Sequence, residues 1–395
     1  MKNKRGIPQN LFIYLVIYYF SMGISKYVQV LWFAKNDNLI NYSLSYSSMA
    51  IFGSLSFIIS TFISGWSIKK ILKTFVPIYA LGMSLRIFSG SAIVAIISGG
   101  VAGIGASICA LAIRYWIFYL VDKKEENNKS KIISTRYIIM QVSLMLATFV
   151  AGQLLYIVKI ENSYIYLLIL SAIMILMLTA FKDIPNENNV ITQSSRKKFQ
   201  LPDSKSKAIT LYVSVVLMGI STSLLEPLLP VIIKDVGYNL SISTTIFTAY
   251  GLFKIASIFI FKMEFFYKNS SITFLLLEVI SGGVVLLIGL TGLDKNILLL
   301  LLIMVGVETA GFFVLKEMME YTMFPKSEML LYLGISQSAF LFGDSLGSIF
   351  GAMIYEKSGS NQLILYFGLF TVVSSSIYFM LYVIFKKNKI DVVQE

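Results

Sequence analysis

The chain has 395 residues, of which 56% are hydrophobic and only 14% are charged, and its formal net charge is +12. A soluble globular protein of this length could not keep so much apolar side chain out of water, so a polytopic membrane protein is expected. In that class a positive balance indicates basic loops facing anionic lipid, and nucleic acid is not expected as a partner.

Histidine is absent and Cys109 is the single cysteine. The composition therefore offers no zinc site of the usual kind, no histidine proton relay and no internal disulfide. We expect neither a metal nor a cofactor.

A membrane helix needs about 20 apolar residues. The first apolar run is too long for a cleavable signal, and we expect it to be retained. On the same criterion the sequence predicts twelve spans, near residues 11–33, 43–66, 75–95, 97–121, 132–157, 163–181, 208–233, 242–261, 271–293, 297–320, 329–355 and 361–385. The turn between the third and the fourth span is expected at Ser98-Gly99-Gly100.

Lysine and arginine set the expected orientation, because cytoplasmic loops carry the excess of both residues. With the N-terminus inside, the outer loops hold single lysines and the inner loops hold clusters. We expect both termini in the cytoplasm and, from the richness in Ile, Lys and Asn, a bacterial plasma membrane. The inner clusters are Lys69, Lys70 and Lys73; Lys123, Lys124, Lys129 and Lys131; Lys262 and Lys268; and Lys386, Lys387 and Lys389.

One long polar stretch divides the spans six to six. The sequence predicts an N-terminal bundle over 1–181, a cytoplasmic linker over 182–207 and a C-terminal bundle over 208–395. The linker contains Arg196-Lys197-Lys198, which favours contact with the anionic leaflet; a regulatory site is the alternative.

The two halves share local sequence. Met22-Gly23-Ile24-Ser25 is repeated as Met218-Gly219-Ile220-Ser221, and Phe52-Gly53 has a counterpart in Tyr250-Gly251. A polytopic chain built from two similar halves is typical of secondary transporters.

Glycines at small-xxx-small spacing mark two of the predicted spans. This spacing favours close helix packing within each half, with a sliding surface between the halves as the alternative. The glycines are Gly99, Gly100, Gly103 and Gly105 in one span and Gly343, Gly347 and Gly351 in the other.

The layout resembles the major facilitator superfamily over nearly the whole chain. The first inner loop, Ser64–Lys73, stands where that family has a glycine–aspartate–glycine–basic signature; Gly65 and Lys73 match it, whereas Lys69 and Leu72 do not. The segment Ala147–Gly152 lacks the proline-glycine pair of many drug/proton antiporters. The resemblance implies an all-α membrane protein of twelve helices in two six-helix bundles related by pseudo-two-fold symmetry. It also implies a central cavity lined by helices 1, 4, 7 and 10 and rocker-switch alternating access.

Eight charged residues fall inside predicted spans, where each costs about 2.5–3.5 kcal/mol at a helix centre and therefore needs a partner or a function. They are Lys26, Arg86, Arg114, Glu226, Lys254, Glu278, Glu308 and Asp344.

We expect Lys26 and Glu226 to form a gating pair. Both lie toward the outer half of the leading span of their repeat, and Lys26 shares a helix face with Gln29. Protonation of Glu226, or its displacement by substrate, would open the gate. A purely structural ion pair is the alternative.

The other intramembrane charges divide into expected functional and structural groups. Glu308 is predicted to carry a proton, and a neutral, hydrogen-bonded carboxyl is the alternative. Arg114 has three open roles: binding an anionic group, pairing with Glu308, or snorkelling to the inner surface. Asp344 is a candidate for proton coupling, although a structural pair with Lys254 in the same half is favoured.

Three further sets complete the expectations. A structural role is expected for Arg86 and Glu278 on supporting helices, and a solvated cluster for Lys316, Glu317 and Glu320. Aromatic residues are mostly expected to face lipid, with Trp32, Trp116 and Phe312 as candidates for an apolar cavity wall.

The sequence contains no glycine-rich phosphate loop, which disfavours an ATP-driven pump. It also contains no carboxylate cluster that would suggest an enzyme. The sequence therefore favours a monomeric proton-coupled exporter of a small amphipathic or cationic compound, such as a drug, a natural product or a short peptide. The alternative is a proton-coupled importer of a sugar or nucleoside, resembling the lactose permease group through Gly351–Ser358 and Arg86. A receptor or channel is a third class, with little support.

Overall fold

A computed structural model describes residues 7–36, 38–88, 90–122, 126–157, 162–182, 184–185, 202–229, 232–233, 236–238 and 240–394. Within these residues every regular element is a helix. The greater part of the predicted linker, including its basic run at residues 196–198, lies outside the described ranges.

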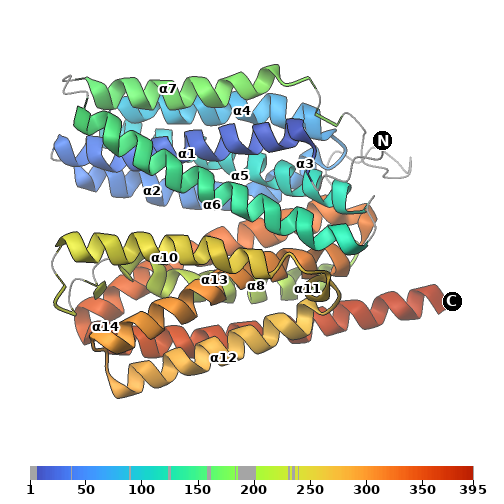
Figure 1. Ribbon diagram of the computed structural model, residues 1–395. Helices are drawn as coiled ribbons and strands as arrows, with labels where there is room; N and C mark the ends of the chain where they lie inside the picture. The colour runs from blue at the N-terminus through green and yellow to red at the C-terminus, as the bar shows by residue number, and fades with distance from the viewer. Residues whose placement is uncertain are drawn as a thin grey trace. The chain divides into compact units, whose positions relative to one another are not determined.

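The helices of the first half run in chain order as follows (Figure 1): α1 (Gln9–Lys35), α2 (Leu39–Ser54), α3 (Ser56–Ile63), α4 (Ile68–Ser84), η1 (Leu85–Ile87), α5 (Ala92–Asp122), α6 (Glu126–Ile157), α7 (Ser163–Met177) and η2 (Leu178–Ala180). Among them α5 packs along both α2 and α4, while α7 packs against α1 and α4.

The second half contains α8 (Lys205–Leu225), η3 (Glu226–Leu228), α10 (Leu240–Ile260), α11 (Glu264–Lys268), α12 (Ser270–Thr291), α13 (Lys295–Met323), η4 (Lys326–Glu328) and α14 (Met329–Gln394). The last of these bends at Gly359, whose φ of 80° is left-handed and suits a residue without Cβ. It therefore consists of two helices, 329–358 and 360–394. The hairpin partners α12 and α13 pack side by side, and α10 packs on α13.

Ten helices in the described part of the chain are long and apolar enough to cross a membrane. The remaining two predicted spans fall on α4 with η1, where three lysines begin the helix, and on α10, whose apolar stretch Ala249–Ile260 is short. The architecture is that of a multi-pass membrane protein, and the count of twelve stays a prediction.

One predicted boundary is wrong. The turn between the third and fourth spans lies before Ala92, and Ser98-Gly99-Gly100 is inside α5. Glycine serves packing at this point, because a Cβ on Gly99 would lie 2.0 Å from the carbonyl oxygen of Ser45 on α2.

The prediction that the glycine stripes serve packing within each half is confirmed. A Cβ on Gly103 would lie 2.2 Å from the carbonyl oxygen of Met49. In the second half, Cβ atoms on Gly343, Gly347 and Gly351 would lie 2.2 to 2.4 Å from carbonyl oxygens of α8. These helices touch backbone to backbone, which is how small residues stabilise helix pairs in lipid.

The repeated Met-Gly-Ile-Ser sequence has a similar packing role in both halves. A Cβ on Gly23 would lie 2.7 Å from Cβ of Ala147 on α6, and one on Gly219 would lie 2.4 Å from the carbonyl oxygen of Phe340 on α14. In each half, the glycine brings the first helix close to the fifth.

Helix contacts divide the chain into two compact units. The first comprises Met1–Lys123, Thr135–Leu201 and Ser327–Ser338; the second comprises Lys124–Ser134, Pro202–Lys326 and Ala339–Glu395. Each unit thus holds most of one half of the chain, together with the beginning of the fifth helix of the other half. The predicted boundaries at 181 and 208 stay a prediction.

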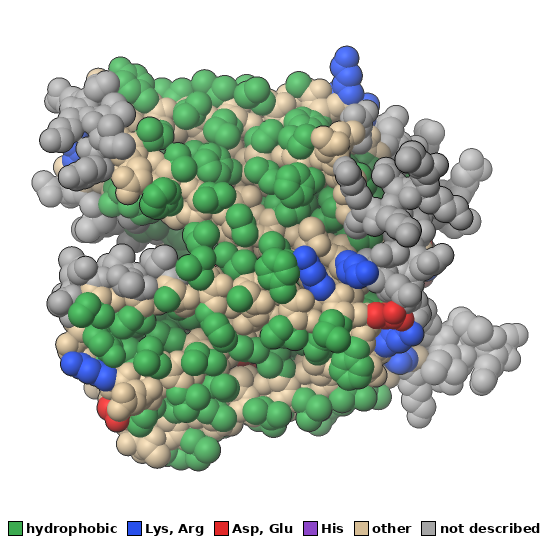
Figure 2. All heavy atoms as spheres, in the orientation of Figure 1, with side chains coloured by type: hydrophobic (Ala, Val, Ile, Leu, Met, Phe, Trp, Pro, Cys, Tyr) green, Lys and Arg blue, Asp and Glu red, His purple; other side chains and the backbone are tan. Residues whose placement is uncertain are grey.

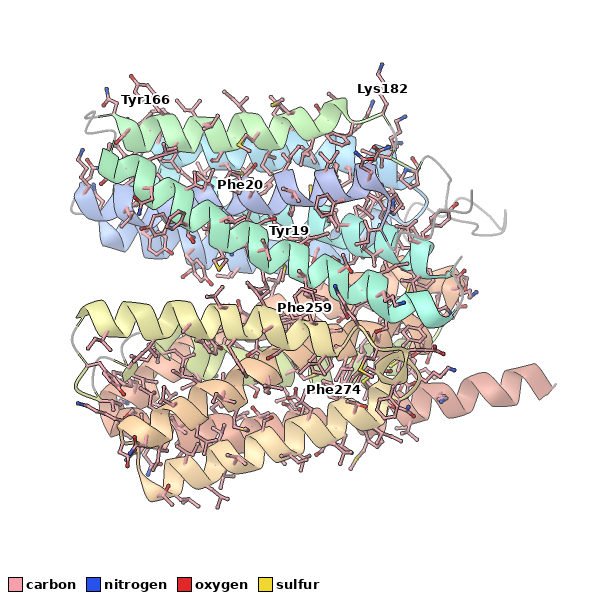
Figure 3. The ribbon with its side chains drawn as sticks, viewed as in Figure 1. Tyr19, Phe20, Tyr166, Lys182, Phe259 and Phe274 are labelled. Atoms are coloured by element: carbon pink, nitrogen blue, oxygen red, sulfur yellow. The ribbon has the colours of Figure 1, made fainter. Side chains whose placement is uncertain are left out.

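The outer side chains of the helices are largely apolar, as lipid contact requires. Hydrophobic side chains are spread over the described helices on the face drawn in Figure 2, with few charged ones among them. Tyr166 on α7, which is 57% exposed, points away from its neighbouring helices (Figure 3).

Candidate functional site

A buried ion pair lies in the second unit, where α8 ends. Glu226 is the first residue of η3, and Pro227, which lacks a backbone N–H, accompanies the change there from α-helix to 3-10 turn. Lys254 on α10 donates from Nζ to Glu226 Oε1. The lysine is buried, whereas the side chain of Glu226 remains 38% exposed. Lys254 Nζ also lies 5.2 Å from the ring centre of Tyr250, one helical turn earlier on α10.

This pair corrects the predicted partner of Lys254. The sequence predicted Asp344 as the partner of Lys254, but the ammonium group instead contacts Glu226, the first residue of η3. Asp344 on α14 accepts a hydrogen bond from the Ser223 hydroxyl of α8. Since Ser223 lies three residues before Glu226, both carboxyl groups are held at the same end of α8.

Glu308 extends the charged cluster to α13. Its carboxyl is buried, and the Thr309 hydroxyl lies 3.3 Å from Glu308 Oε2. Glu226 and Lys254 are both near enough to interact electrostatically with Glu308. Lys254 thus lies near two carboxyl groups, one half-exposed and one buried.

A fourth ionisable group, Glu278 on α12, completes the cluster. Its side chain is only 1% exposed, it accepts a hydrogen bond of 3.0 Å from Ser375 of α14, and it is near enough to Glu308 to interact with it electrostatically. Glu278 was expected to be structural, and its closeness to Glu308 was not predicted. The antiparallel hairpin of α12 and α13 contained the signal, because equal steps back from its turn place 278 near 308.

We name the group Glu226, Lys254, Glu278 and Glu308 the acidic cluster. Its side chains come from η3, α10, α12 and α13 of the second unit. Lys254 serves Glu226 and Glu308, Glu278 lies against Glu308, and all but Glu226 are buried. Such a set can take up or release protons and respond to a cation that competes with Lys254.

A buried arginine lies in the first unit. Arg86 in η1 is 1% exposed, and its Nη1 donates to Ser25 Oγ of α1 at 2.7 Å. Its Nη2 lies 3.5 Å from the sulfur of Met49, and Nε has no hydrogen-bond partner in the described part of the chain. Tyr42 and Tyr79 are near enough to interact with its charge. Among the described residues no carboxylate neutralises this guanidinium.

The predicted gating residues of α1 lie in the first unit. Lys26 has an exposed side chain, whereas Gln29 is buried and donates to Ser45 Oγ of α2 at 3.0 Å. Trp32 donates from its indole nitrogen to the Ile87 carbonyl at 2.9 Å, and its ring lies 6.0 Å from that of Tyr164. Glu226 belongs to the second unit and is paired with Lys254 in this structure.

The other two predicted binding residues are buried. Arg114 on α5 donates from Nη1 to Gln337 Oε1 at 3.2 Å, and this glutamine belongs to the same unit. Glu308 belongs to the second unit, and the considered pairing of Arg114 with Glu308 stays a prediction. Phe312 packs 6.1 Å from both Phe274 and Phe340, ring centre to ring centre, within the second unit (Figure 3 labels Phe274).

The expected solvated cluster on α13 is instead buried. Lys316 Nζ lies 2.5 Å from Glu320 Oε1, and Tyr321 donates to Glu317. Each bond joins residues four apart on one helix, so α13 itself supplies a partner to these buried side chains.

The first inner loop shows how the chain uses the residue at the family's aspartate position. Lys69 donates from its backbone nitrogen to the Pro185 carbonyl at 3.2 Å and from Nζ to the Lys182 carbonyl at 3.3 Å. The neighbouring Ser67 caps α4 by accepting from the backbone N–H of Lys70. The loop is thereby fastened to the chain after α7 through carbonyl groups.

No family model matches the chain, and no curated protein matches it by sequence. Solved structures do match it. The human organic anion transporter MFSD10 (TETRAN) superposes with a TM-score of 0.72 at 12% identity, over 95% of this chain and 100% of that one. A bacterial homologue of the iron transporter ferroportin, in an outward-facing state, gives 0.68 at 11% identity over 96% and 98%. The Escherichia coli fucose:proton symporter FucP (N162A) gives 0.65 at 12% identity over 95% and 98%.

The fold is therefore that of the major facilitator superfamily transporters, as the sequence resemblance implied. At these identities the likeness establishes architecture, and the chemistry depends on this chain's own residues.

Proposed function

We propose that the protein is a secondary transporter of a small molecule that uses the proton gradient, with rocker-switch alternating access between its two units. The observation that carries the proposal is the acidic cluster, because buried carboxyl groups beside one lysine are costly in a membrane unless they serve transport. Glu226 and Glu308 are the proton-coupling residues, and Asp344 assists at the end of α8.

We propose export of an amphipathic or cationic compound as the direction and class. Glu226 is the exposed member of the cluster and the one that a cation can reach. A cationic substrate that displaces Lys254 from Glu226 would leave the lysine to neutralise Glu308. Protonation of Glu226 would release the substrate, so that one carboxylate serves proton and cation in turn.

Import of a sugar or nucleoside with protons is the second candidate. The fucose:proton symporter among the matching structures favours it, as does the buried Arg86, whose guanidinium offers hydrogen bonds. Under this alternative, Gln29 and Trp32 of α1 and Arg114 of α5 contact the substrate. The substrate class therefore has to be determined by experiment.

The two directions are separated by measuring accumulation in membranes of opposite orientation. An overexpressing strain is first profiled for resistance, which supplies a transported compound. Energised everted vesicles accumulate that compound if the protein exports, whereas right-side-out cells accumulate it if the protein imports.

Glu226→Gln tests the role of the carboxylate. The variant is expected to lose accumulation driven by the proton gradient while retaining exchange of labelled for unlabelled compound, because the amide keeps the shape but cannot titrate. Glu264→Gln is the matched control, since Glu264 pairs with Lys268 on the short α11 and lies outside the cluster. Accumulation at the wild-type level in Glu226→Gln would refute the role.

A further inference from the structure

Glu278 is a buried acid that the proposed proton-coupling set does not include. It is carried by α12, a helix expected only to support the bundle. Its side chain is 1% exposed and that of Glu308 is 3% exposed, so neither carboxyl group is hydrated by bulk water.

The packing of α12 against α13 places the two acids opposite each other. The Phe274 and Phe312 rings lie 6.1 Å apart, each four residues from one of the two acids, and a Cβ on Gly311 would meet Leu277. In an antiparallel pair this register brings 278 next to 308, so the two buried carboxyl groups face each other between α12 and α13.

Two buried carboxyl groups that face each other can form a hydrogen bond only when one of them carries a proton, because a carboxylate can only accept. The other donors around the pair are few. Ser375 donates to Glu278 Oε2, the Thr309 hydroxyl lies near Glu308 Oε2, and Glu278 Oε1 accepts from no donor among the described residues.

The charged groups near the pair do not remove this requirement. Lys254 on α10 is the cation nearby, and Glu226 of η3 takes its hydrogen bond. Tyr250 of α10 is the remaining titratable neighbour of Glu308. Two ionised carboxylates side by side in a dry interior repel each other strongly, so the pair holds one proton.

We propose that Glu278 and Glu308 form a single proton-binding site in which one proton is shared between α12 and α13. Glu278 is thus a proton ligand, and the site delivers its proton to Glu226 through Glu308. The shared proton does not depend on the proposed function. Its delivery during transport does rest on that function.

The test counts protonated carboxyl groups in purified protein by infrared spectroscopy, with no substrate present. The wild type is expected to show the C=O stretch of a protonated carboxyl group at neutral pH, and this band is expected to vanish on strong alkalinisation. The Glu278→Gln and Glu308→Gln variants are each expected to lose this band, and the double variant is expected to lose no more than either single variant.

That non-additivity is the signature of one shared proton. Two independently protonated acids would instead lose half of the band in each single variant and all of it in the double. A wild-type spectrum without a protonated carboxyl band, or a band unchanged in both single variants, would overturn the proposal. The wild-type spectrum alone tests whether a protonated carboxyl group is present, even if a variant does not fold.

Glu264→Gln serves as the control, since Glu264 is paired with Lys268 on α11 and its loss should leave the neutral-pH band unchanged. The readout involves no transport. A shared proton found in a protein that moves no solute with protons would therefore preserve the site and refute the proposed function alone.

Discussion

At the scale of single residues, the Glu226–Lys254 pair is asymmetric. The Lys254 side chain is 11% exposed, whereas the Glu226 side chain is 38% exposed. Water can therefore hydrate the carboxylate if its partner is removed, but it cannot reach the ammonium as easily. Removing either partner should consequently have different costs.

We predict that Glu226→Ala destabilises the protein more than Lys254→Met does. Loss of the acid removes the hydrogen-bonded partner of a buried ammonium group and leaves Glu308 alone to offset its charge, at a cost of about 3 kcal/mol. Loss of the lysine leaves a carboxylate that solvent can screen, at a cost of about 1 kcal/mol. Thermal unfolding in detergent measures both, and the double variant should lie above Glu226→Ala in stability. Equal losses of stability in the two single variants would show that the difference in side-chain exposure does not determine the cost of removing each partner.

Arg86 gives a second prediction at this scale. The two terminal nitrogens of its guanidinium contact Ser25 and Met49 at the same time. A lysine has a single terminal nitrogen and cannot form both contacts in this geometry. Arg86→Lys should lower the free energy of unfolding by about 1–3 kcal/mol, and Ser25→Ala by about 1 kcal/mol. The same unfolding measurement applies, with Lys26→Met as a control on an exposed neighbour. An Arg86→Lys variant as stable as the wild type would mean that the forked geometry contributes nothing.

The residues of the acidic cluster were largely predictable as important, but their partners were not. A charge in an apolar run is visible in any sequence, so Glu226, Lys254 and Glu308 could be singled out. Which of them meet depends on helix rotation and on neighbours far apart in the chain. Hence Lys254 was assigned to Asp344 and Glu278 was set aside as structural.

At the scale of elements, glycine positions decide which helices touch. The packing stripes are predictable from the sequence, because small residues four apart make a flat face on a helix. The pair Gly99-Gly100, in contrast, was expected to form a turn, although it lies inside α5. Glycine permits both a turn and a close contact, and only the partner, here the Ser45 carbonyl of α2, distinguishes them.

The packing account predicts different outcomes for two glycine-to-alanine changes. Gly343→Ala places a methyl group 2.2 Å from the Val216 carbonyl, so α8 and α14 must separate, at a cost of about 1–3 kcal/mol. Gly251→Ala on α10 meets nothing within 4 Å and should be neutral or stabilise by up to about 1 kcal/mol. Thermal unfolding of both variants checks the difference. Similar behaviour of the two would argue against backbone contact between α8 and α14.

At the scale of the whole molecule, the internal repeat was the most informative pattern. It indicated two similar halves, and the match to transporter structures over about 95% of the chain agrees with that architecture. The two compact units, however, do not coincide fully with the two halves of the sequence. The first residues of α6 and of α14, the fifth helices of the two halves, each join the unit formed mainly by the other half. A boundary drawn along the sequence could not anticipate this exchange.

Compound-dependent proton movement tests the central claim most directly. The purified protein is placed in vesicles containing a pH-sensitive dye, and a compound identified by resistance profiling is added without an imposed gradient. We predict that the wild type produces a change in internal pH that depends on the compound, and that Glu308→Gln and Glu226→Gln produce none while Glu264→Gln matches the wild type. Transport of the compound with no proton movement in the wild type, or unchanged proton movement in both cluster variants, would contradict the account.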